Sequence, residues 1–215
     1  MYFLTKALYF PPVSEASLDG ILAVGGDLSS ERLLLAYQSG IFPWFDEEDP
    51  ILWWSPPERM VVNPKEYKVS KSLRNILNRN LFQVSFNQDF EGVIKACQMA
   101  PRKDQNGTWI TEGMVRAYLE LHEKGFATSV EVWQNENLVG GLYGVNLGKV
   151  FCGESMFSNV SNASKVAFVN LIQKLKEENY HLLDCQLHNN YLEQLGAFEI
   201  SRNAYMKILK NSLSS

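Results

Sequence analysis

Two short stretches, GESMFS at residues 153–158 and DCQ at residues 184–186, decide how this chain is expected to fold. The apolar segment KVFC at residues 149–152 precedes the first stretch and is typical of a strand. Between the two stretches, apolar residues recur at helical spacing: Val166, Phe168, Val169, Ile172 and Leu175. We therefore expect a strand, a loop, a helix and a second strand.

This unit predicts where two acidic side chains lie. A strand–helix–strand crossover normally makes the second strand parallel to the first. Glu154 and Asp184 would then emerge together at the carboxyl edge, where open α/β sheets bind ligands. Gln186 follows Asp184 by two residues, so an extended chain would place both side chains on one side. A capping or salt-bridging role for each acid stays open beside a catalytic one.

From Arg59 onward the sequence predicts an α+β fold. Turn residues at 135–137 and 146–148 predict that the strands on either side of them pair antiparallel, as a meander. The order of three antiparallel strands, a helix and a parallel strand resembles the core of the acetyltransferase (GNAT) fold. The expected strands are 60–62, 81–86, 128–133, 138–147, 149–152, 181–184 and 198–208, and the expected helices are 70–80, 89–98, 111–123, 162–179 and 189–195.

Residues 1 to about 60 differ in composition and are expected to form a small N-terminal domain, with residues 61–215 forming the catalytic one. The first sixty residues hold six of the eight prolines and three of the five tryptophans. One helix is expected there, capped by Ser29 and ended by Gly40. The aromatic, loop-like segments at 41–45 and 51–57 either pack between the two domains or form a stacking surface for a ligand.

Composition narrows the class of protein. The chain has 215 residues, of which 46% are hydrophobic, and a formal net charge of -4. That length can bury a full core, and the charge argues against a protein that coats nucleic acid while leaving room for a local basic patch. No apolar run suggests a membrane span or a signal peptide, so we expect a cytoplasmic protein. The spacing of three cysteines and three histidines indicates neither disulfides nor a metal site.

A local basic patch is predicted on the helix that begins at Ser70. Lys71, Arg74 and Arg79 share a face opposite the apolar stripe, and the helix carries no acid. An ordinary solvated face explains the charges alone. In a protein of net negative charge, this helix is also a candidate surface for phosphate contacts.

The paired carboxylates and the amide suit a reaction whose substrates bring their own nucleophile and leaving group. Neither Ser155 nor Cys185 has the sequence context of an activated nucleophile. Attack of an amine on an activated ester needs mainly positioning. An acyl-CoA-dependent N-acetyltransferase is the alternative, although residues 157–165 lack the glycines expected of a pyrophosphate-binding turn. A tRNA-binding or peptide-binding module on an inactive core is a third hypothesis.

Several blocks in order along the chain resemble bacterial leucyl/phenylalanyl-tRNA-protein transferases. These blocks are GGDLS (25–29), GIFPWF (40–45), LWWSP (52–56), GTWI (107–110), VGGLYG (139–144), GESMFS (153–158), NASK (162–165) and DCQ (184–186). The resemblance implies transfer of Leu or Phe, and less well Met, from aminoacyl-tRNA to proteins that begin with Arg or Lys, for degradation through the N-degron pathway. It implies a GNAT-like domain behind a small N-terminal one. No cofactor or metal is expected, and we expect a monomer.

The resemblance also assigns residues to roles. The catalytic candidates that it implies are Asp184, Gln186 and Glu154. The aminoacyl-adenosine end of the donor is expected near Trp44, Trp109, Met156, Leu142, Leu183, Phe157 and Ser158, and the tRNA near Lys71, Arg74 and Arg79. Family members often carry methionine where this chain has Leu142. We expect Asp184 to orient the attacking amine, directly or through Gln186, because an α-amine is already partly neutral near pH 7 and needs no strong base.

Overall fold

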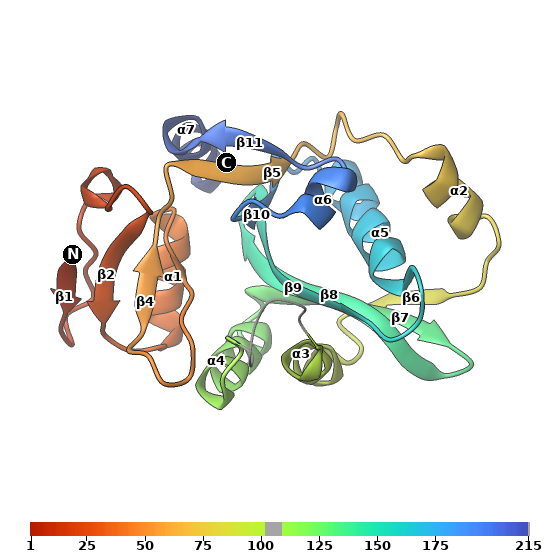
Figure 1. Cartoon of the computed structure of the whole chain (residues 1–215), viewed down its shortest axis with the longest axis horizontal. Helices are drawn as coiled ribbons and strands as arrows, with labels where there is room; N and C mark the ends of the chain where they lie inside the picture. Colours follow the sequence, from red (N-terminus) through yellow and green to blue (C-terminus); the bar gives the residue numbers. More distant parts are fainter. Residues whose placement is uncertain (102–108, 215) are drawn as a thin grey trace.

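The computed structural model describes residues 1–101 and 109–214, and within them the strands form two sheets (Figure 1). The smaller sheet has the order β1 (Tyr2–Leu4), β2 (Ile21–Gly25), β4 (Leu52–Trp54) and β3 (Phe42–Pro43), and a short 3-10 helix spans Val13–Glu15. Helix α1 (Ser30–Gln38) begins where expected, because the Ser29 side chain accepts from the Arg32 N–H. Gly40, with φ +75°, lets the chain turn away after the helix.

The aromatic segments that were expected as loops supply two short strands of this sheet. Trp53 in β4 is fully buried, and its ring meets that of Phe10 edge to face at 4.9 Å. Trp44 and Trp54 are only partly buried, and the Trp54 indole donates to the Trp44 carbonyl at 2.7 Å. Some of these aromatics thus fill the core, whereas Trp44 borders a cavity; the stacking surface for a ligand stays a prediction.

The larger sheet has the order β11-β5-β10-β9-β8-β7-β6 and confirms the mixed α+β class. Strands β7, β8 and β9 pair antiparallel, as the turn signals predict. Strand β10 runs parallel to β9 with Asp184 opposite Cys152, which confirms the crossover. The bounds are β5 (Glu58–Val62), β6 (Gln83–Phe86), β7 (Ala127–Gln134), β8 (Asn137–Leu147), β9 (Val150–Ser158), β10 (Leu182–Gln186) and β11 (Phe198–Ser201).

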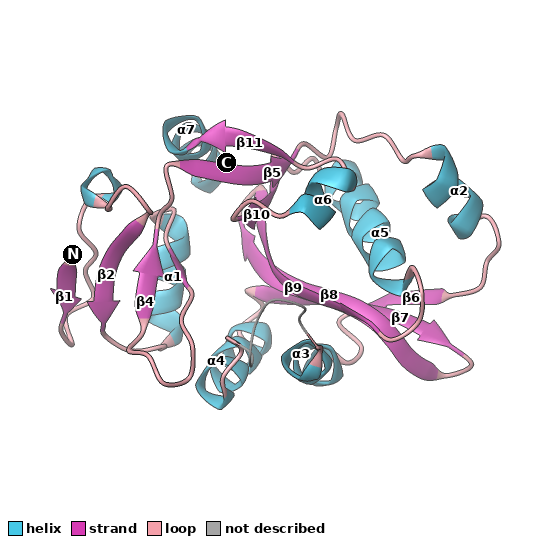
Figure 2. Cartoon of the chain, viewed as in Figure 1, coloured by secondary structure: helices cyan, strands magenta, loops and turns pink. Residues whose placement is uncertain are grey.

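Helices cover both faces of the larger sheet (Figure 2). One face carries α5 and the short α6, and the other carries α3 and α4. The bounds are α2 (Lys71–Leu77), α3 (Phe90–Met99), α4 (Glu112–Glu123), α5 (Ala163–Glu177), α6 (Asn190–Gln194) and α7 (Arg202–Leu213). Each of these elements except α7 confirms a predicted helix, with ends that differ by a few residues.

Two predicted elements are wrong. The stretch 153–158 is not a loop: β9 continues through it to Ser158, paired with β8 across a register shift at Tyr143/Gly144. The predicted strand 198–208 ends at Ser201, whose side chain accepts from the Ala204 N–H and starts α7. Tyr205 and Leu209, four residues apart on the buried face of α7, match helical spacing better than strand alternation.

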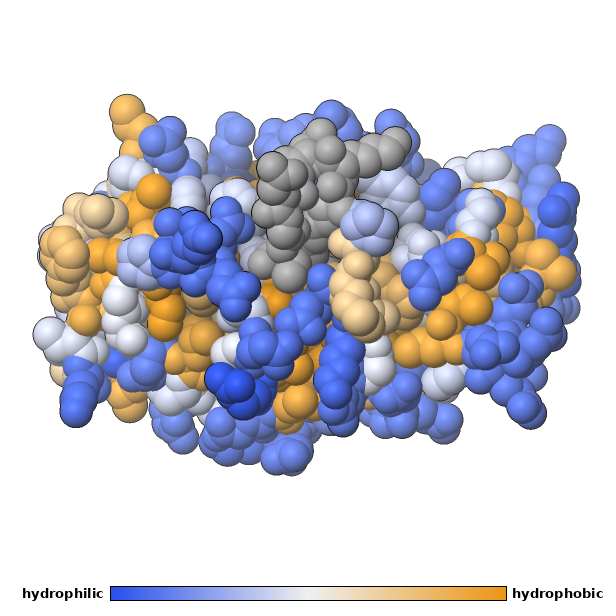
Figure 3. All heavy atoms as spheres, turned by 60° about the horizontal axis from the view of Figure 1, so that its bottom comes forward, coloured by the Kyte–Doolittle hydropathy of each residue, from blue (hydrophilic) through white to orange (hydrophobic). Residues whose placement is uncertain are grey.

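One hydrophobic cluster spans both sheets. It includes Leu22 and Trp53 from the smaller sheet together with Val61 and Leu182 from the larger one. Residues 2–54 supply the smaller sheet, and β5, which begins at Glu58, already belongs to the larger one. Apolar residues gather on the surface at the end of the molecule that carries β1 (Figure 3). Phe3 and Leu18 are among the large apolar side chains that are exposed. In residues 1–101 and 109–214, no helix combines the length and apolar character that a membrane crossing requires.

Candidate active site

A β-bulge at the end of β10 separates the two side chains that were expected to lie together. Asp184 pairs with Val61 of β5, but the next pair is Gln186 with Met60, so the register shifts between them. Gln186 has φ +62°, and its backbone N–H donates to the Asp184 Oδ1 at 2.9 Å. A bulge of this kind re-aims a side chain. The prediction from an extended chain is therefore wrong here: Asp184 is fully buried, whereas Gln186 lines a cavity.

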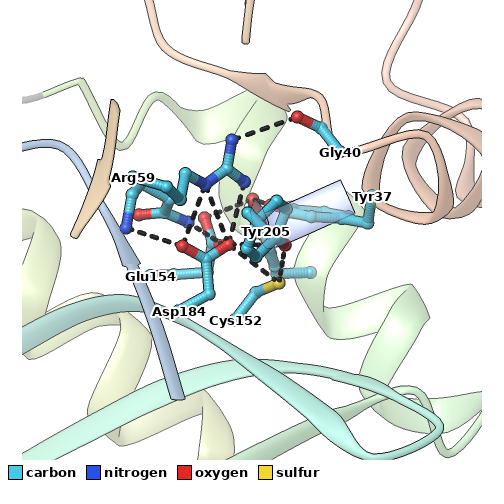
Figure 4. A network of polar contacts seen from close by, with 9 residues as sticks. Tyr37, Gly40, Arg59, Cys152, Glu154, Asp184 and Tyr205 are labelled. Atoms are coloured by element: carbon cyan, nitrogen blue, oxygen red, sulfur yellow. Dashed lines mark hydrogen bonds and ion pairs between the residues drawn. The ribbon is translucent and has the colours of Figure 1, made fainter. Parts of the chain in front are cut away.

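Asp184 lies in a closed network with Arg59 (Figure 4). The guanidinium donates from Nε to Oδ1 at 2.9 Å and from Nη2 to Oδ2 at 2.8 Å. The Tyr205 hydroxyl donates to Oδ2 at 2.9 Å, and the Cys152 thiol lies 3.5 Å from the same oxygen. Both Arg59 and Asp184 are 2% exposed or less. Every hydrogen bond of the Asp184 carboxylate is thus made to the protein.

Arg59 also joins the two parts of the molecule. Its Nη1 donates to the Gly40 carbonyl at 3.0 Å, directly after α1 (Figure 4). The guanidinium carbon lies 4.8 Å from the centre of the Phe42 ring and 4.4 Å from that of Tyr205. Burial lowers the pKa of Arg59, but the charge of Asp184, its hydrogen bonds to Arg59 and the neighbouring Tyr205 and Cys152 together raise the pKa above its ordinary value. Arg59 is therefore a permanent cation.

Glu154 is the carboxylate that faces the cavity. The Gln186 amide donates to Oε1 at 2.8 Å, and the Tyr118 hydroxyl donates to Oε2 at 2.8 Å. Burial raises the pKa of Glu154 to about 7, although the hydroxyls of Tyr118 and Tyr37 and the Gln186 amide lower it, while the charge of Asp184 raises it further. Glu154 consequently changes its charge within the pH range in which an α-amine begins to lose its proton.

A cavity of about 580 Å³ lies above Glu154 and Gln186. Its wall has an apolar part, formed by Leu142, Met156, Phe168, Leu171, Leu183 and Leu192, and an aromatic part, formed by Phe42, Trp44 and Trp109. Such a volume and such a wall, with a few convergent polar groups, are typical of a small-molecule site. The arrangement can hold an apolar side chain beside a carboxylate and an amide.

Neither cysteine beside the site is a nucleophile. Burial raises the pKa of the Cys152 thiol, and the charge of Asp184 raises it further. The pKa of Cys185, which lines the cavity, is raised for the same two reasons. Both thiols are therefore protonated near neutral pH, and the thiolate is the reactive form.

The structure brings together most, but not all, of the predicted site residues. The cavity is lined by Glu154, Gln186, Trp44, Trp109, Met156, Leu142 and Leu183. Asp184 lies beneath it, Phe157 is buried in the core, and the exposed Ser158 accepts from the Ser164 N–H at the start of α5. Of the segment 107–110, Gly107 and Thr108 lie outside the described residues.

Sequence reasoning missed Arg59, Tyr205, Tyr37 and Tyr118. Arg59 had one signal, a cation directly before the apolar residues Met60, Val61 and Val62 of a strand, where a charged side chain usually requires a buried partner. The three tyrosines had none, because each lies at a helical position where an aromatic residue is normally part of the core. Within the described ranges, no group of three or more His, Cys, Asp and Glu side chains is placed to bind a metal ion.

The basic side chains are exposed, as expected, at one end of the molecule. Lys71 and Arg74 lie on α2, whose first turn is capped by Ser70 and contains no acid. The helix ends at Leu77, three residues earlier than predicted, so Arg79 lies in the turn that follows. Arg74 also borders a shallow hollow together with Lys68 and Gln173.

The buried ion pair gives the first prediction. Arg59→Met should lower the free energy of unfolding by about 3–5 kcal/mol, because it leaves the Asp184 carboxylate buried without its partner. Arg59→Met combined with Asp184→Asn should lose distinctly less, since no uncompensated charge remains and the amide oxygen can still accept from the Gln186 N–H, which bonds one of the two Asp184 oxygens. Urea denaturation measures both, and Lys95→Met, which breaks an exposed pair with Glu91, is the control expected to change little. Equal losses of unfolding free energy in the single and double variants would contradict the conclusion that Arg59 compensates the buried charge of Asp184.

Comparison of the sequence with known proteins identifies the family to which the chain belongs. The model of the leucyl/phenylalanyl-tRNA protein transferase family matches residues 61–210, and the model of that family's N-terminal domain matches residues 26–57. Proteins named leucyl/phenylalanyl-tRNA–protein transferase from Flavobacterium johnsoniae and Flavobacterium psychrophilum are 61% and 57% identical to the chain. Each comparison covers 98% of this chain and 100% of the relative. A relative of the same name from Thermodesulfovibrio yellowstonii is 51% identical, over 99% of this chain and 86% of its own. The chain belongs to the leucyl/phenylalanyl-tRNA protein transferase family.

Proposed function

We propose that this protein moves leucine or phenylalanine, and less well methionine, from aminoacyl-tRNA to the α-amine of proteins that begin with Arg or Lys. The family assignment over nearly the whole chain supports aminoacyl transfer from tRNA to protein. The observation that carries the proposal is the cavity, in which an apolar wall adjoins Glu154 and Gln186. A cytoplasmic monomer that marks proteins for the N-degron pathway is the setting that we propose.

The cavity has the features that a donor with an apolar amino acid requires. Leu, Phe and Met differ in shape, yet all three are unbranched at Cβ. Met156 offers them an adaptable wall, because a thioether chain repacks at small cost. Trp44 and Trp109 border the same cavity, and aromatic side chains are groups on which a terminal adenine can stack. We propose that these residues hold the aminoacyl-adenosine end of the donor.

The proposed chemistry uses two of the polar groups that line the cavity, Glu154 and Gln186. The neutral amine of the acceptor attacks the ester carbonyl carbon, the C–N bond forms, and the nitrogen passes its surplus proton to the Glu154 carboxylate. The bond between the carbonyl carbon and the ribose oxygen then breaks, and the leaving oxygen takes up the proton that Glu154 received, so that an amide, a free hydroxyl and the Glu154 carboxylate result. Gln186 holds Glu154 through its amide. Asp184 is buried and paired with Arg59, so its role is to accept from the Gln186 N–H and thereby to stabilise the bulge that turns the Gln186 side chain toward the cavity.

The alternative, acetyl transfer from acetyl-CoA, is less well supported. We propose that the larger sheet is GNAT-like, which by itself fits either donor. Pyrophosphate binding at a helix start requires free backbone N–H groups. At the start of α5 the Ala163 N–H donates to the Val160 carbonyl at 3.1 Å, and the Ser164 N–H donates to the Ser158 hydroxyl at 3.2 Å. The chain itself uses amides that the cofactor would need.

A direct assay tests the proposal. The protein is incubated with Leu-tRNA and a peptide that begins with Arg, and mass spectrometry should show the addition of one leucine. A peptide of the same sequence with an acetylated α-amine should stay unchanged, because no nucleophile is left. Addition of an acetyl group when acetyl-CoA replaces the tRNA, with no leucine added from Leu-tRNA, would overturn the proposal in favour of the alternative.

The exposed cations on and after α2 supply a prediction about tRNA. Arg74→Ala should weaken the binding of every donor tRNA alike and reduce the log–log salt slope of binding by about one unit or slightly less, because one phosphate contact is lost. Lys210→Ala, an exposed cation on α7, is the matched control and should leave the slope unchanged. Filter binding at several salt concentrations measures the slope. Weaker binding of a single isoacceptor would contradict backbone contact.

A further inference from the structure

Behind Glu154, two tyrosines form a line of hydroxyl groups that leads away from the cavity. Tyr118 comes from α4 and donates to the Glu154 Oε2 at 2.8 Å. Tyr37 comes from α1, beside the smaller sheet, and its hydroxyl is hydrogen-bonded to that of Tyr118. Both side chains are almost completely inaccessible to solvent, at 1% exposure or less.

The direction of these hydrogen bonds follows from counting protons. A tyrosine hydroxyl has one hydrogen to donate. Tyr118 uses its hydrogen on Glu154, so Tyr37 must donate to the Tyr118 oxygen. Burial raises the pKa of both hydroxyls, and the charge of Glu154 raises it further, so both remain protonated at working pH. Each tyrosine hydroxyl therefore donates in the direction of the Glu154 carboxylate, Tyr37 to Tyr118 and Tyr118 to Glu154.

The donors leave the cavity side of Glu154 open. Oε1 accepts from the Gln186 amide and Oε2 accepts from Tyr118, which uses two of about four lone-pair positions on a carboxylate. The titratable and charged groups around Glu154 are Tyr37 on α1, Tyr118 on α4, Cys152 on β9, Asp184 on β10 and Arg59 on β5, which is paired with Asp184. Among them, Tyr118 donates to Glu154 itself, and Tyr37 donates to Tyr118.

We propose that Tyr118 and Tyr37 are positioning residues for aminoacyl transfer: Tyr118 holds Glu154 as a carboxylate turned toward the cavity, and Tyr37 holds Tyr118. This inference rests on the function proposed above and adds to it the residues that keep the proton acceptor ready. The α1 helix, which lies outside the larger sheet, thereby contributes a side chain to the reaction. Removing either hydroxyl takes away a bond that favours the ionised form of Glu154.

A titration of the free protein tests the inference without any substrate. The ¹³C resonance of the Glu154 carboxyl, assigned by its disappearance in Glu154→Gln, is followed from pH 5 to 9. In Tyr118→Phe the midpoint should move to higher pH, and in Tyr37→Phe it should move in the same direction by less. Tyr180→Phe removes a hydroxyl that bonds Asn146 away from the site, and it should leave the midpoint unchanged. An unchanged midpoint in Tyr118→Phe would overturn the inference.

The pH dependence of the transfer rate is a second measurement, which would not change if the tyrosines were only structural. Relative to wild type, Tyr118→Phe should lose about tenfold more activity at pH 6 than at pH 8.5, the size expected when a carboxylate loses a charge-assisted hydrogen bond. A loss of equal size at both pH values would overturn the positioning role. If no variant, wild type included, transfers leucine, the proposed function fails, and the ¹³C midpoints still decide whether the tyrosines hold Glu154 ionised.

Discussion

The buried pair of Arg59 and Asp184 is the interaction on which the arrangement of the site depends. Arg59 lies in β5 and Asp184 lies in β10, so the pair spans two neighbouring strands of the larger sheet, and the Arg59 bond to the Gly40 carbonyl adds the turn that follows α1. The carboxylate in turn holds the N–H of Gln186. A buried ion pair stabilises little by itself. Its effect here is to fix the bulge that points Gln186 into the cavity.

Two carboxylates at one edge of the sheet thus have different environments, and we propose different tasks for them. Asp184 is closed off by permanent donors, whereas Glu154 is held by neutral donors and lines the cavity. Burial beside another acid raises the pKa of Glu154 to about 7, close to that of an α-amine. Groups whose pKa values are pushed apart by their surroundings are commonly the ones that divide acid and base roles in an active site.

Much of this arrangement could be predicted from the sequence, and the failures have physical reasons. Helical spacing and turn residues gave the meander, the crossover and the meeting of Glu154 with Asp184 at one edge. Alternation along an extended strand could not reveal the bulge, because the left-handed backbone at Gln186 is stabilised by the distant Arg59–Asp184 pair. Tyr37 and Tyr118 lie 81 residues apart, so their contact depends on tertiary packing that no local pattern records.

The most direct test of this account asks which carboxylate accepts the proton. The dependence of kcat/KM on pH is measured for wild type, Asp184→Asn and Glu154→Gln, with a peptide whose α-amine pKa is known. Below about pH 7 the wild-type rate should fall with two ionisations, those of the amine and of Glu154. We expect Asp184→Asn to be slower than wild type but to keep both ionisations. The ionisation of Glu154 should move to lower pH, because the charge of Asp184, which raises the pKa of Glu154, has been removed. Glu154→Gln should keep only the amine. A result in which Asp184→Asn showed the ionisation of the amine alone while Glu154→Gln still showed two ionisations would contradict the account.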